Sequence, residues 1–303
     1  MRIFVAGASG TIGIPLVRAL VAAGHQVTAL TRSPQKQDEL RRLGATPAVA
    51  DALDPGALAA VVAAARPTHV IHQLTALPKE GPSKASDLVA TNRLRIDGTR
   101  HLLDASIRAG VQRIIGGSFA LLPGAETRTT IAGINEAADA TRSMETQILN
   151  ANRSNHIEGI VLRYGLFYGP TNPSTIMMVE MIRKRRFPTI RGDQGQLPFI
   201  HLDDAVSATL AALDSGVPGA VYDIVDDRAI SISEAVRLIA DYTGAPAPRT
   251  VPAWLLRLLM PYRARMLTTR LPLSNAKARA ELRWRPTFPT LREGLSKSFS
   301  QAA

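Results

Sequence analysis

The sequence predicts an α/β fold: a doubly wound parallel sheet with a smaller C-terminal lobe. Short β-branched or apolar runs alternate with Ala- and Leu-rich stretches through the first half of the chain. This order builds a parallel sheet covered by helices on both faces. A glycine-rich segment lies between the first strand and the first helix. The alternation ends after Arg163 in a Gly/Pro-rich loop, Tyr164 to Pro173, where we place the start of the lobe.

The elements of the first half follow from hydrophobic periodicity. Strands are expected at Arg2–Ala6, Gln26–Leu30, Thr46–Ala50, His69–Gln73, Arg113–Ser118 and Gly159–Arg163. Apolar residues at i, i+3 and i+4 predict helices at Ile14–Ala23, Pro55–Ala65, Lys84–Ala109 and Ala137–Asn152. In the second half, helices are expected at Asp203–Leu213, Ser231–Thr243, Pro252–Leu259 and from Leu291 onward, with one strand near Ala220–Val225.

Composition excludes several classes of protein. With 303 residues, 46% hydrophobic and 20% charged, the chain is typical of a globular protein and not of a disordered one. It has no cysteine, which excludes a disulfide framework, a Cys-ligated metal and a Cys nucleophile. No apolar run approaches the roughly 18 residues of a membrane span. We therefore expect a cytoplasmic protein without a membrane partner.

The chain is basic, with a formal net charge of +11. Nine basic residues lie between Arg249 and Arg285, against Glu281 alone, and Arg183 to Arg186 form a second cluster. An anionic small-molecule substrate is one explanation. A solvated arginine-rich face or a subunit contact is another, and no motif indicates nucleic acid. His69 and His72 do not converge on a strand, so no metal site is expected.

The glycine-rich segment predicts a dinucleotide site. Gly7, Ser9, Gly10, Thr11, Ile12 and Gly13 belong to the segment GASGTIG, directly after the first strand and at the start of the first helix. In a Rossmann domain such glycines allow a tight turn, a close approach of the backbone to the pyrophosphate, and close packing of helix on strand. The helix N-terminus then supplies N–H donors and partial positive charge. A purely structural turn is the alternative.

The end of the second strand favours NADP(H) over NAD(H). An acidic side chain there would bind the ribose 2′-hydroxyl of NAD, but this chain has Thr31, Arg32 and Ser33. A guanidinium and a hydroxyl suit a 2′-phosphate, and Lys36 is a further candidate to assist them.

Five segments together resemble the extended short-chain dehydrogenase/reductases, which include the NAD-dependent epimerase/dehydratase group. They are GASGTIG, VIHQLTA, LRYGLFYGP, FIHLDDA and KARAELRWRP, and they span residues 1 to about 290 in the right order. The resemblance implies an NADP-binding Rossmann domain over residues 1–165, with later returns near 199–228. Residues 166–303 would be mainly a substrate-binding lobe, with the active site between the two parts.

The resemblance also assigns residues by position. Asp51 and Ala52 would contact adenine, although Asp51 is equally well explained as a carboxylate that leads into a helix. Gln73, Leu74 and Thr75 would line the pyrophosphate and ribose, and Tyr164 and Gly165 would lie beside the nicotinamide. Such proteins often form homodimers through the helices that correspond to Lys84–Ala109 and Ala137–Asn152.

The chain departs from the family pattern where the chemistry is done. Ser118 fits the family's Ser or Thr after the fifth strand, but the Tyr and the Lys four residues later are missing. No Tyr precedes Tyr164 and no Lys lies between Ala85 and Arg183; the two empty positions fall at about Ala138 and Arg142. Leu197 stands where nucleotide-sugar enzymes have a diphosphate-binding Arg, and Leu166 replaces a frequent Asn.

These observations predict an NADP-dependent oxidoreductase, or an epimerase or isomerase, acting on a small organic carbonyl or alcohol that is not a nucleotide sugar. Ser118 would bind the substrate oxygen, and Tyr164, Tyr168, Glu145 or His201 would supply the proton. The alternative is a protein that senses NADP(H) without catalysis, which the missing Tyr and Lys support.

Overall fold

The computed structural model describes residues 1–303 apart from 79–80, 83, 121–132, 155, 272 and 301–303. Its centre is a seven-stranded sheet in the order β10-β6-β5-β4-β1-β2-β3, in which every pairing is parallel. The strands are β1 (Arg2–Ala6), β2 (Gln26–Thr31), β3 (Thr46–Val49), β4 (His69–His72), β5 (Arg113–Phe119), β6 (Glu158–Tyr164) and β10 (Val221–Ile224). The predicted Rossmann-type fold class is thus confirmed.

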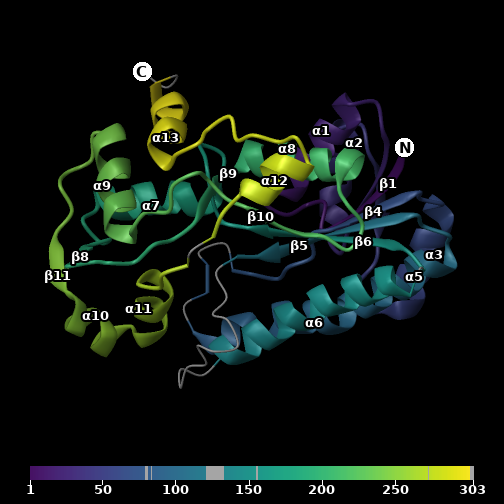
Figure 1. Ribbon diagram of the computed structural model, residues 1–303, viewed down its shortest axis with the longest axis horizontal. Coiled ribbons are helices and arrows are strands. Elements are labelled where there is room, and N and C mark those ends of the chain that lie inside the picture. Colours follow the sequence, from purple (N-terminus) through teal and green to yellow (C-terminus); the bar gives the residue numbers. More distant parts are fainter. Residues whose placement is uncertain (79–80, 83, 121–132, 155, 272, 301–303) are drawn as a thin grey trace.

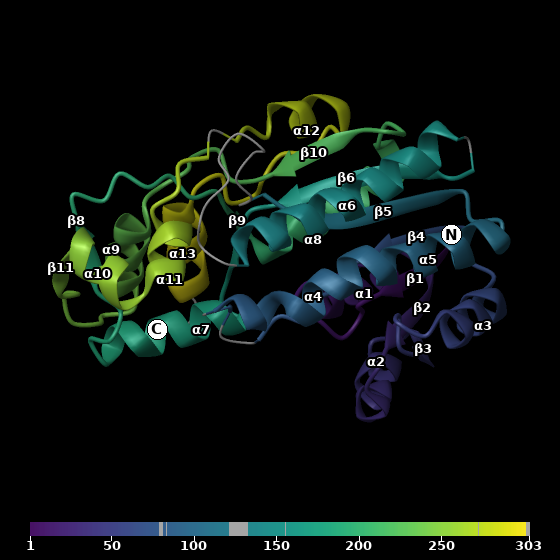
Figure 2. The same cartoon turned by 90° about the horizontal axis from the view of Figure 1, so that it is seen from below.

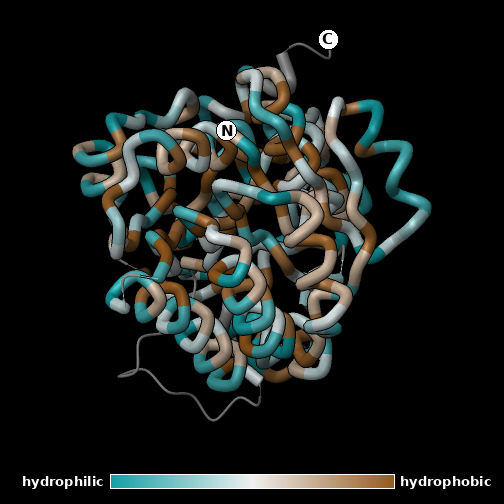
Figure 3. The backbone as a smooth tube through the Cα atoms, turned by 90° about the vertical axis from the view of Figure 1, so that its right-hand side faces the viewer, coloured by the Kyte–Doolittle hydropathy of each residue, from teal (hydrophilic) through white to brown (hydrophobic). Residues whose placement is uncertain are grey.

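Both faces of the sheet are buried, as the alternating side chains of β1 show. Ile3 and Val5 pack on one side of the sheet, and Phe4 and Ala6 pack on the other. The first side is covered by α1 (Gly13–Ala22), α8 (Leu202–Ser215) and α12 (Ala276–Glu281). The second is covered by α3 (Pro55–Ala65), α5 (Thr99–Arg108) and α6 (Ile134–Arg153). Figure 1 shows these two groups above and below the strands, and Figure 3 shows hydrophilic residues concentrated on the outer turns.

Two local features differ from the sequence-based expectation. A short helix, α2 (Gln37–Arg42), was not predicted, because its six residues bury only Leu40 and carry no apolar period. The helix expected over residues 84–109 is a continuous helical run of changing geometry. It comprises a 3₁₀ turn (Ala85–Leu88), α4 (Val89–Arg93), a π-helical segment (Leu94–Gly98) and α5.

A smaller lobe stands at the carboxyl edge of the sheet (Figure 2). It contains α7 (Pro173–Arg183), α9 (Ile232–Tyr242), α10 (Ala253–Leu259), α11 (Pro261–Leu267) and α13 (Leu291–Ser300). Two pairs of short strands accompany these helices: β7 (Leu166–Tyr168) with β9 (Phe199–His201), and β8 (Thr189–Arg191) with β11 (Thr250–Pro252). Between lobe segments the chain returns to the sheet through α8 and β10. Nowhere in the described ranges is a helix both long and apolar enough to cross a membrane.

Asp204, near the start of α8, binds the C-terminal segment at residues 287–288 by hydrogen bonds. The carboxylate is almost fully buried, and its two oxygens accept the backbone N–H groups of Thr287 and Phe288 at 2.7 and 2.9 Å. Nearby, the indole N–H of Trp284 donates to Ser207 Oγ at 2.9 Å. These bonds give the second aspartate of the FIHLDDA segment, Asp204, a structural role: its buried carboxylate satisfies two N–H groups that would otherwise lack partners.

Candidate functional site

The loop after β1 is built so that only glycine fits at two positions. Gly7 has φ +88°, and a Cβ there would lie 2.4 Å from the carbonyl oxygen of Gln73. A Cβ on Gly13 would lie 2.2 Å from the carbonyl oxygen of Gly7. The loop turn is closed by the N–H of Gly10, which donates to the same carbonyl at 3.1 Å. Loop, neighbouring strand and helix therefore touch backbone to backbone, as a dinucleotide cradle requires.

The first turn of α1 is arranged to receive an anion. The helix begins at Gly13 with buried Ile12 as its N-cap, and no side chain caps it and no acidic residue lies in its first turn. Gly10 and Thr11 are exposed at the tip of the loop. The N–H groups at this end carry partial positive charge and have no competing carboxylate, so the residues present fit the pyrophosphate of a dinucleotide.

The end of β2 is tied to this loop by hydroxyl groups. The buried Thr31 forms a hydrogen bond of 3.1 Å with the hydroxyl of Ser9, and it accepts the N–H of Ser33 at 3.2 Å. Arg32 is exposed and forms no hydrogen bond or ion pair with any residue that the structure describes. Lys36 is paired with Glu39 at 2.8 Å on the surface. The guanidinium of Arg32 is therefore unpaired at the end of β2, and its contact with a 2′-phosphate stays a prediction.

The other residues expected at the cofactor lie along the same sheet edge. Asp51 is exposed, and its carboxylate accepts the N–H of Leu53 at 2.9 Å, which closes the turn before α3. Ala52 is buried, and its carbonyl accepts from His101 Nδ1 at 3.0 Å. After β4, Leu74 is half-buried and Thr75 is exposed. The turn at Asp51 agrees with the structural explanation of that carboxylate, and its contact with adenine stays a prediction.

Tyr164 is held on both sides by hydrogen bonds within the core. Its hydroxyl accepts from Gln73 Nε2 at 3.1 Å and lies 2.7 Å from Thr209 Oγ1 on α8. Because Thr209 donates its own proton to the carbonyl of Ala205, Tyr164 is the donor in this second bond. Burial raises the pKa of Tyr164 to about 12. The phenolic proton therefore points toward α8 and is strongly retained at neutral pH.

Ser118, on β5, faces the opposite side of the sheet and belongs to a buried ion-paired cluster. Its hydroxyl donates to Glu145 Oε1 on α6 at 2.5 Å. Arg163 on β6 donates to both oxygens of the same carboxylate, at 2.8 Å from Nε and 2.6 Å from Nη2. The hydrogen bond to Glu145 raises the pKa of Arg163. The structure thus brings together two of the five predicted catalytic candidates, Ser118 and Glu145, and adds Arg163, which the sequence did not single out.

The two positions where the family's Tyr and Lys are missing, Ala138 and Arg142, both lie on α6. Ala138 is buried, whereas Arg142 turns outward and pairs with Asp139. Thr141 is buried and donates its hydroxyl to the carbonyl of Ala137. Along the buried face of α6, Glu145 is therefore the only side chain that carries a charge among the described residues.

Tyr168 and His201 lie together at the base of the lobe. Their rings meet edge to face with centroids 5.1 Å apart, and the hydroxyl of Tyr168 donates to the carbonyl of Thr290 at 3.3 Å. Burial and the nearby Asp226 raise the pKa of Tyr168 well above its ordinary range. His201 accepts the N–H of Asp203 at Nδ1, at 3.3 Å. Both side chains are engaged in packing and capping, and neither contacts Ser118 directly.

Sequence reasoning missed Arg95, which lies in the π-helical segment and is only 7% exposed. Its charge acts on His72 at the end of β4, on Glu145 and on Tyr262 of α11. Burial lowers the pKa of Arg95 to about 10 and that of His72 to about 4. A charged residue on the buried face of an otherwise amphipathic helix is the signal that would have indicated it. A π-helical turn is itself frequent at functional sites.

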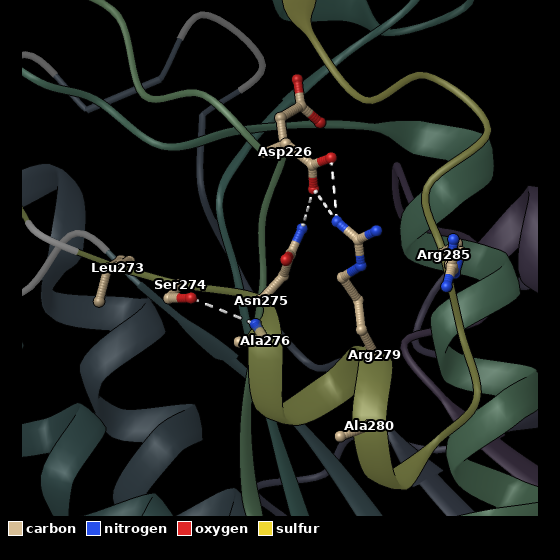
Figure 4. Close-up of a pocket in the computed structure, with 9 residues that line it drawn as sticks. Asp226, Leu273, Ser274, Asn275, Ala276, Arg279, Ala280 and Arg285 are labelled. Carbon is tan, nitrogen blue, oxygen red and sulfur yellow. Dashed lines mark hydrogen bonds and ion pairs between the residues drawn. The ribbon is translucent and has the colours of Figure 1, made fainter.

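A pocket of about 610 Å³ opens beside the end of β10 (Figure 4). It is lined by Asp226, Asp227, Leu273, Ser274, Asn275, Ala276, Arg279, Ala280 and Arg285. The carboxylate of Asp227 is already paired, because it accepts from Asn275 at 2.7 Å and from Arg279 at 3.1 Å. Figure 4 draws these bonds as dashed lines from the labelled Asn275 and Arg279. The pocket contains none of the predicted catalytic or cofactor-binding residues, and among its polar groups Asp227, Asn275 and Arg279 are paired with one another, whereas the carboxylate oxygens of Asp226 have no hydrogen-bond partner in the described residues.

The greater part of the chain, including the glycine loop, matches the model of one protein family. The profile of the NAD-dependent epimerase/dehydratase family matches residues 3–225. The chain belongs to this family. Within the epimerase/dehydratase family, its reductase relatives identify it as an oxidoreductase-type enzyme.

Two curated relatives illustrate the similarity. The 3-diazoavenalumate denitrifying reductase of a Streptomyces species is 39% identical over 98% of this chain and 100% of its own length. The 2-alkyl-3-oxoalkanoate reductase of Stenotrophomonas maltophilia is 25% identical over 81% of this chain and 77% of its own. Both names describe reductases, and both proteins align over most of this chain.

Solved structures agree on the fold. The UDP-glucose 4-epimerase of Thermotoga maritima superposes with a TM-score of 0.80 at 21% identity, covering 99% of this chain and 98% of its own. The Thermus thermophilus UDP-glucose 4-epimerase, solved with NAD, gives a TM-score of 0.78 at 23% identity with the same coverage. At this identity the likeness concerns the fold.

Proposed function

We propose that this enzyme is an NADP-dependent reductase of a small organic electrophile. When bound, the cofactor supplies a hydride from its nicotinamide ring. The glycine loop and the first turn of α1 would hold the pyrophosphate, and Arg32 would bind the 2′-phosphate. Support for NADP comes from the free guanidinium of Arg32 and from the absence of an acidic side chain at the end of β2.

A nucleotide sugar does not suit the lobe. Leu197, at the position where nucleotide-sugar enzymes carry an arginine, is 1% exposed and packs in the core of the lobe. The neighbouring Arg270 donates to the carbonyl and the side-chain oxygen of Gln194, at 2.6 and 3.0 Å. An apolar, buried side chain cannot bind a diphosphate, which supports a smaller substrate.

The observation that carries the proposal is the bonding of Ser118. Reduction of a carbonyl to an alcohol consumes a hydride and a proton, so the enzyme must provide an acid. Here the hydroxyl of Ser118 already donates to Glu145, and Arg163 binds both oxygens of the same carboxyl group. Tyr164 directs its proton toward Thr209. This arrangement favours an electrophile whose reduction needs no proton donor.

An aryl diazonium group is an electrophile of that kind. Hydride adds to its terminal nitrogen, the resulting aryl diazene loses N₂, and its hydrogen ends on the ring carbon. In sum, the diazonium cation and one hydride give the arene and N₂, with two electrons delivered and no proton consumed. The relative that is 39% identical is named for a reductase that removes nitrogen from a diazo compound. We therefore propose reductive removal of a diazo group as the reaction of this enzyme.

A carbonyl substrate is the second candidate. Ser118 stands at the end of β5, where its hydroxyl can also bind a substrate oxygen, and relatives at 25% identity are named as reductases of oxo compounds. An epimerase or isomerase would use the same groups but would return the hydride to its substrate. Net consumption of NADPH separates the reductases from this last case.

The test is the stoichiometry of an in vitro reaction. The purified enzyme is mixed with NADPH and either 4-carboxybenzenediazonium or an aryl ketone of matching size, with a protein-free control for the uncatalysed reaction. We expect NADPH oxidation and N₂ release in equal amounts with the diazonium salt, well above the control. Rapid ketone reduction without acceleration of N₂ release would refute the diazo proposal and support the carbonyl candidate.

A further inference from the structure

Arg95 is the one buried cation of the site without a partner among the described residues. It lies in the π-helical segment between α4 and α5, where an extra residue widens the helical turn, and 93% of its surface is removed from water. The π-helical segment packs against α6, which carries Glu145. The charge of Arg95 also interacts electrostatically with His72 at the end of β4, with Glu145 and with Tyr262 of the lobe.

Glu145 and His72 are bound to other groups and form no hydrogen bond or ion pair with Arg95. Arg163 and Ser118 bind the carboxylate of Glu145, which lies beyond ion-pair distance of Arg95. His72 donates from Nε2 to Thr99 at 2.8 Å and accepts the N–H of Leu74 at Nδ1, so its ring is neutral.

Arg95 forms no hydrogen bond or ion pair with any residue in the described ranges, and the hydroxyl of Tyr262 forms no hydrogen bond there either. A guanidinium has five N–H donors, and burying a charge without a partner is costly. Buried polar groups are normally paired in native proteins. A buried, unpaired Arg beside a reaction site is therefore expected to acquire its partner from a ligand.

We propose that Arg95 binds the carboxylate of the substrate, with the hydroxyl of Tyr262 as a second donor. This inference rests on the proposed function. It names the residue that binds the anionic end of the substrate, whose other end we propose is reduced near Ser118. A planar guanidinium binds a carboxylate through two parallel hydrogen bonds. Glu145 and Asp87 both act on this region electrostatically, so a monoanion fits better than a phosphate dianion.

The test is calorimetric binding of cinnamate and of cinnamamide to the enzyme saturated with NADP⁺. The two probes have nearly the same shape, but only cinnamate is charged. We expect cinnamate to bind the wild type at least about tenfold more tightly than cinnamamide, as a charge-assisted pair implies. Arg95→Gln removes this preference, and Arg95→Lys keeps part of it. The control Arg100→Gln alters an exposed arginine of α5, in the same helical run, and leaves both affinities unchanged.

The thermal midpoint of the free protein is the second readout. If the role of Arg95 is to bind the ligand, Arg95→Gln raises this midpoint or leaves it unchanged, because an unpaired buried charge is removed. If Arg95 instead stabilises the folded protein, the midpoint falls. A lower midpoint, equal binding of the two probes by the wild type, no binding of cinnamate, or wild-type affinity in Arg95→Gln each overturns the proposal.

The outcomes also separate this inference from the proposed reaction. Binding of cinnamate that depends on Arg95, together with failure to release N₂ from 4-carboxybenzenediazonium, supports the carboxylate site and refutes the diazo reaction. Release of N₂ that is equally fast in Arg95→Gln supports the reaction and refutes the carboxylate site.

Discussion

Ser118 donates a hydrogen bond of 2.5 Å to Glu145, across the space between β5 and α6. The acceptor is 6% exposed and is itself paired with Arg163. A serine in this position is oriented by a carboxylate and receives no proton from a neighbouring phenol. The bond is therefore the structural basis of our proposal that the substrate is reduced without a proton from Ser118.

Arg32→Ala tests the cofactor preference. A charge-assisted bond to the 2′-phosphate contributes about 1.5 to 3 kcal/mol, so the affinity for NADPH is expected to fall about tenfold or more. The affinity for NADH should not change, because NADH lacks that phosphate. Calorimetric titration measures both, and Arg41→Ala, in the exposed α2, serves as control. Equal losses for NADPH and NADH would contradict a phosphate contact.

Tyr164→Phe separates a structural from a catalytic phenol. The substitution leaves Gln73 Nε2 without its acceptor in the core, so the free energy of unfolding should fall by about 1 to 2 kcal/mol. The value of kcat should stay that of the wild type, because the phenolic proton is directed to Thr209. Urea denaturation and steady-state kinetics measure the two effects. A large loss of kcat in a stable variant would instead identify Tyr164 as the acid.

Arg163→Met tests the buried ion pair. Removing one partner of a fully buried pair costs about 3 to 5 kcal/mol. The side chain of Arg163 is 40% exposed, so we expect a smaller loss of about 1 to 2 kcal/mol. Urea denaturation of Arg163→Met, of the double variant with Glu145→Gln, and of Arg41→Met as an exposed, ion-paired control gives the comparison. The double variant should recover part of the loss; if it is no more stable than Arg163→Met, the pairing explanation fails.

Asp226→Asn tests a buried carboxyl with a raised pKa. Asp226 is 5% exposed, and burial and the charge of Asp204 raise its pKa to about 8. The folded protein thus keeps this proton to about pH 8, whereas the unfolded chain releases it near the ordinary value of 3.8. Stability is therefore lost as the pH rises from 4 to 8.

Asn cannot ionise, so Asp226→Asn should stabilise the protein more at pH 8 than at pH 4. Denaturation at the two pH values measures the difference, with the exposed Asp214→Asn as control. A variant whose gain does not grow with pH would show that Asp226 is not protonated in the folded state.

Local patterns predicted most of the fold. Alternation of strands and helices, and glycines at fixed spacing, reflect steric rules that act over a few residues, and the structure confirms the predicted fold class. Ser118 and Glu145 were both named from sequence, but their bond was not, since it joins a strand to a helix across an undetermined distance. The short α2 was missed because it buries a single residue, Leu40.

The sequence by itself therefore determined the sheet, the glycine-rich loop, Arg32 at the end of β2 and the lack of a Tyr and Lys pair at the usual spacing. Only the tertiary structure decided which charges are paired. Glu145 binds Arg163 and Ser118, whereas Arg95 is buried without a partner in the described residues and interacts with His72 and Tyr262 only electrostatically. The physical reason is that the energy of a charge depends on its burial and on its neighbours, and these come from segments far apart in the chain.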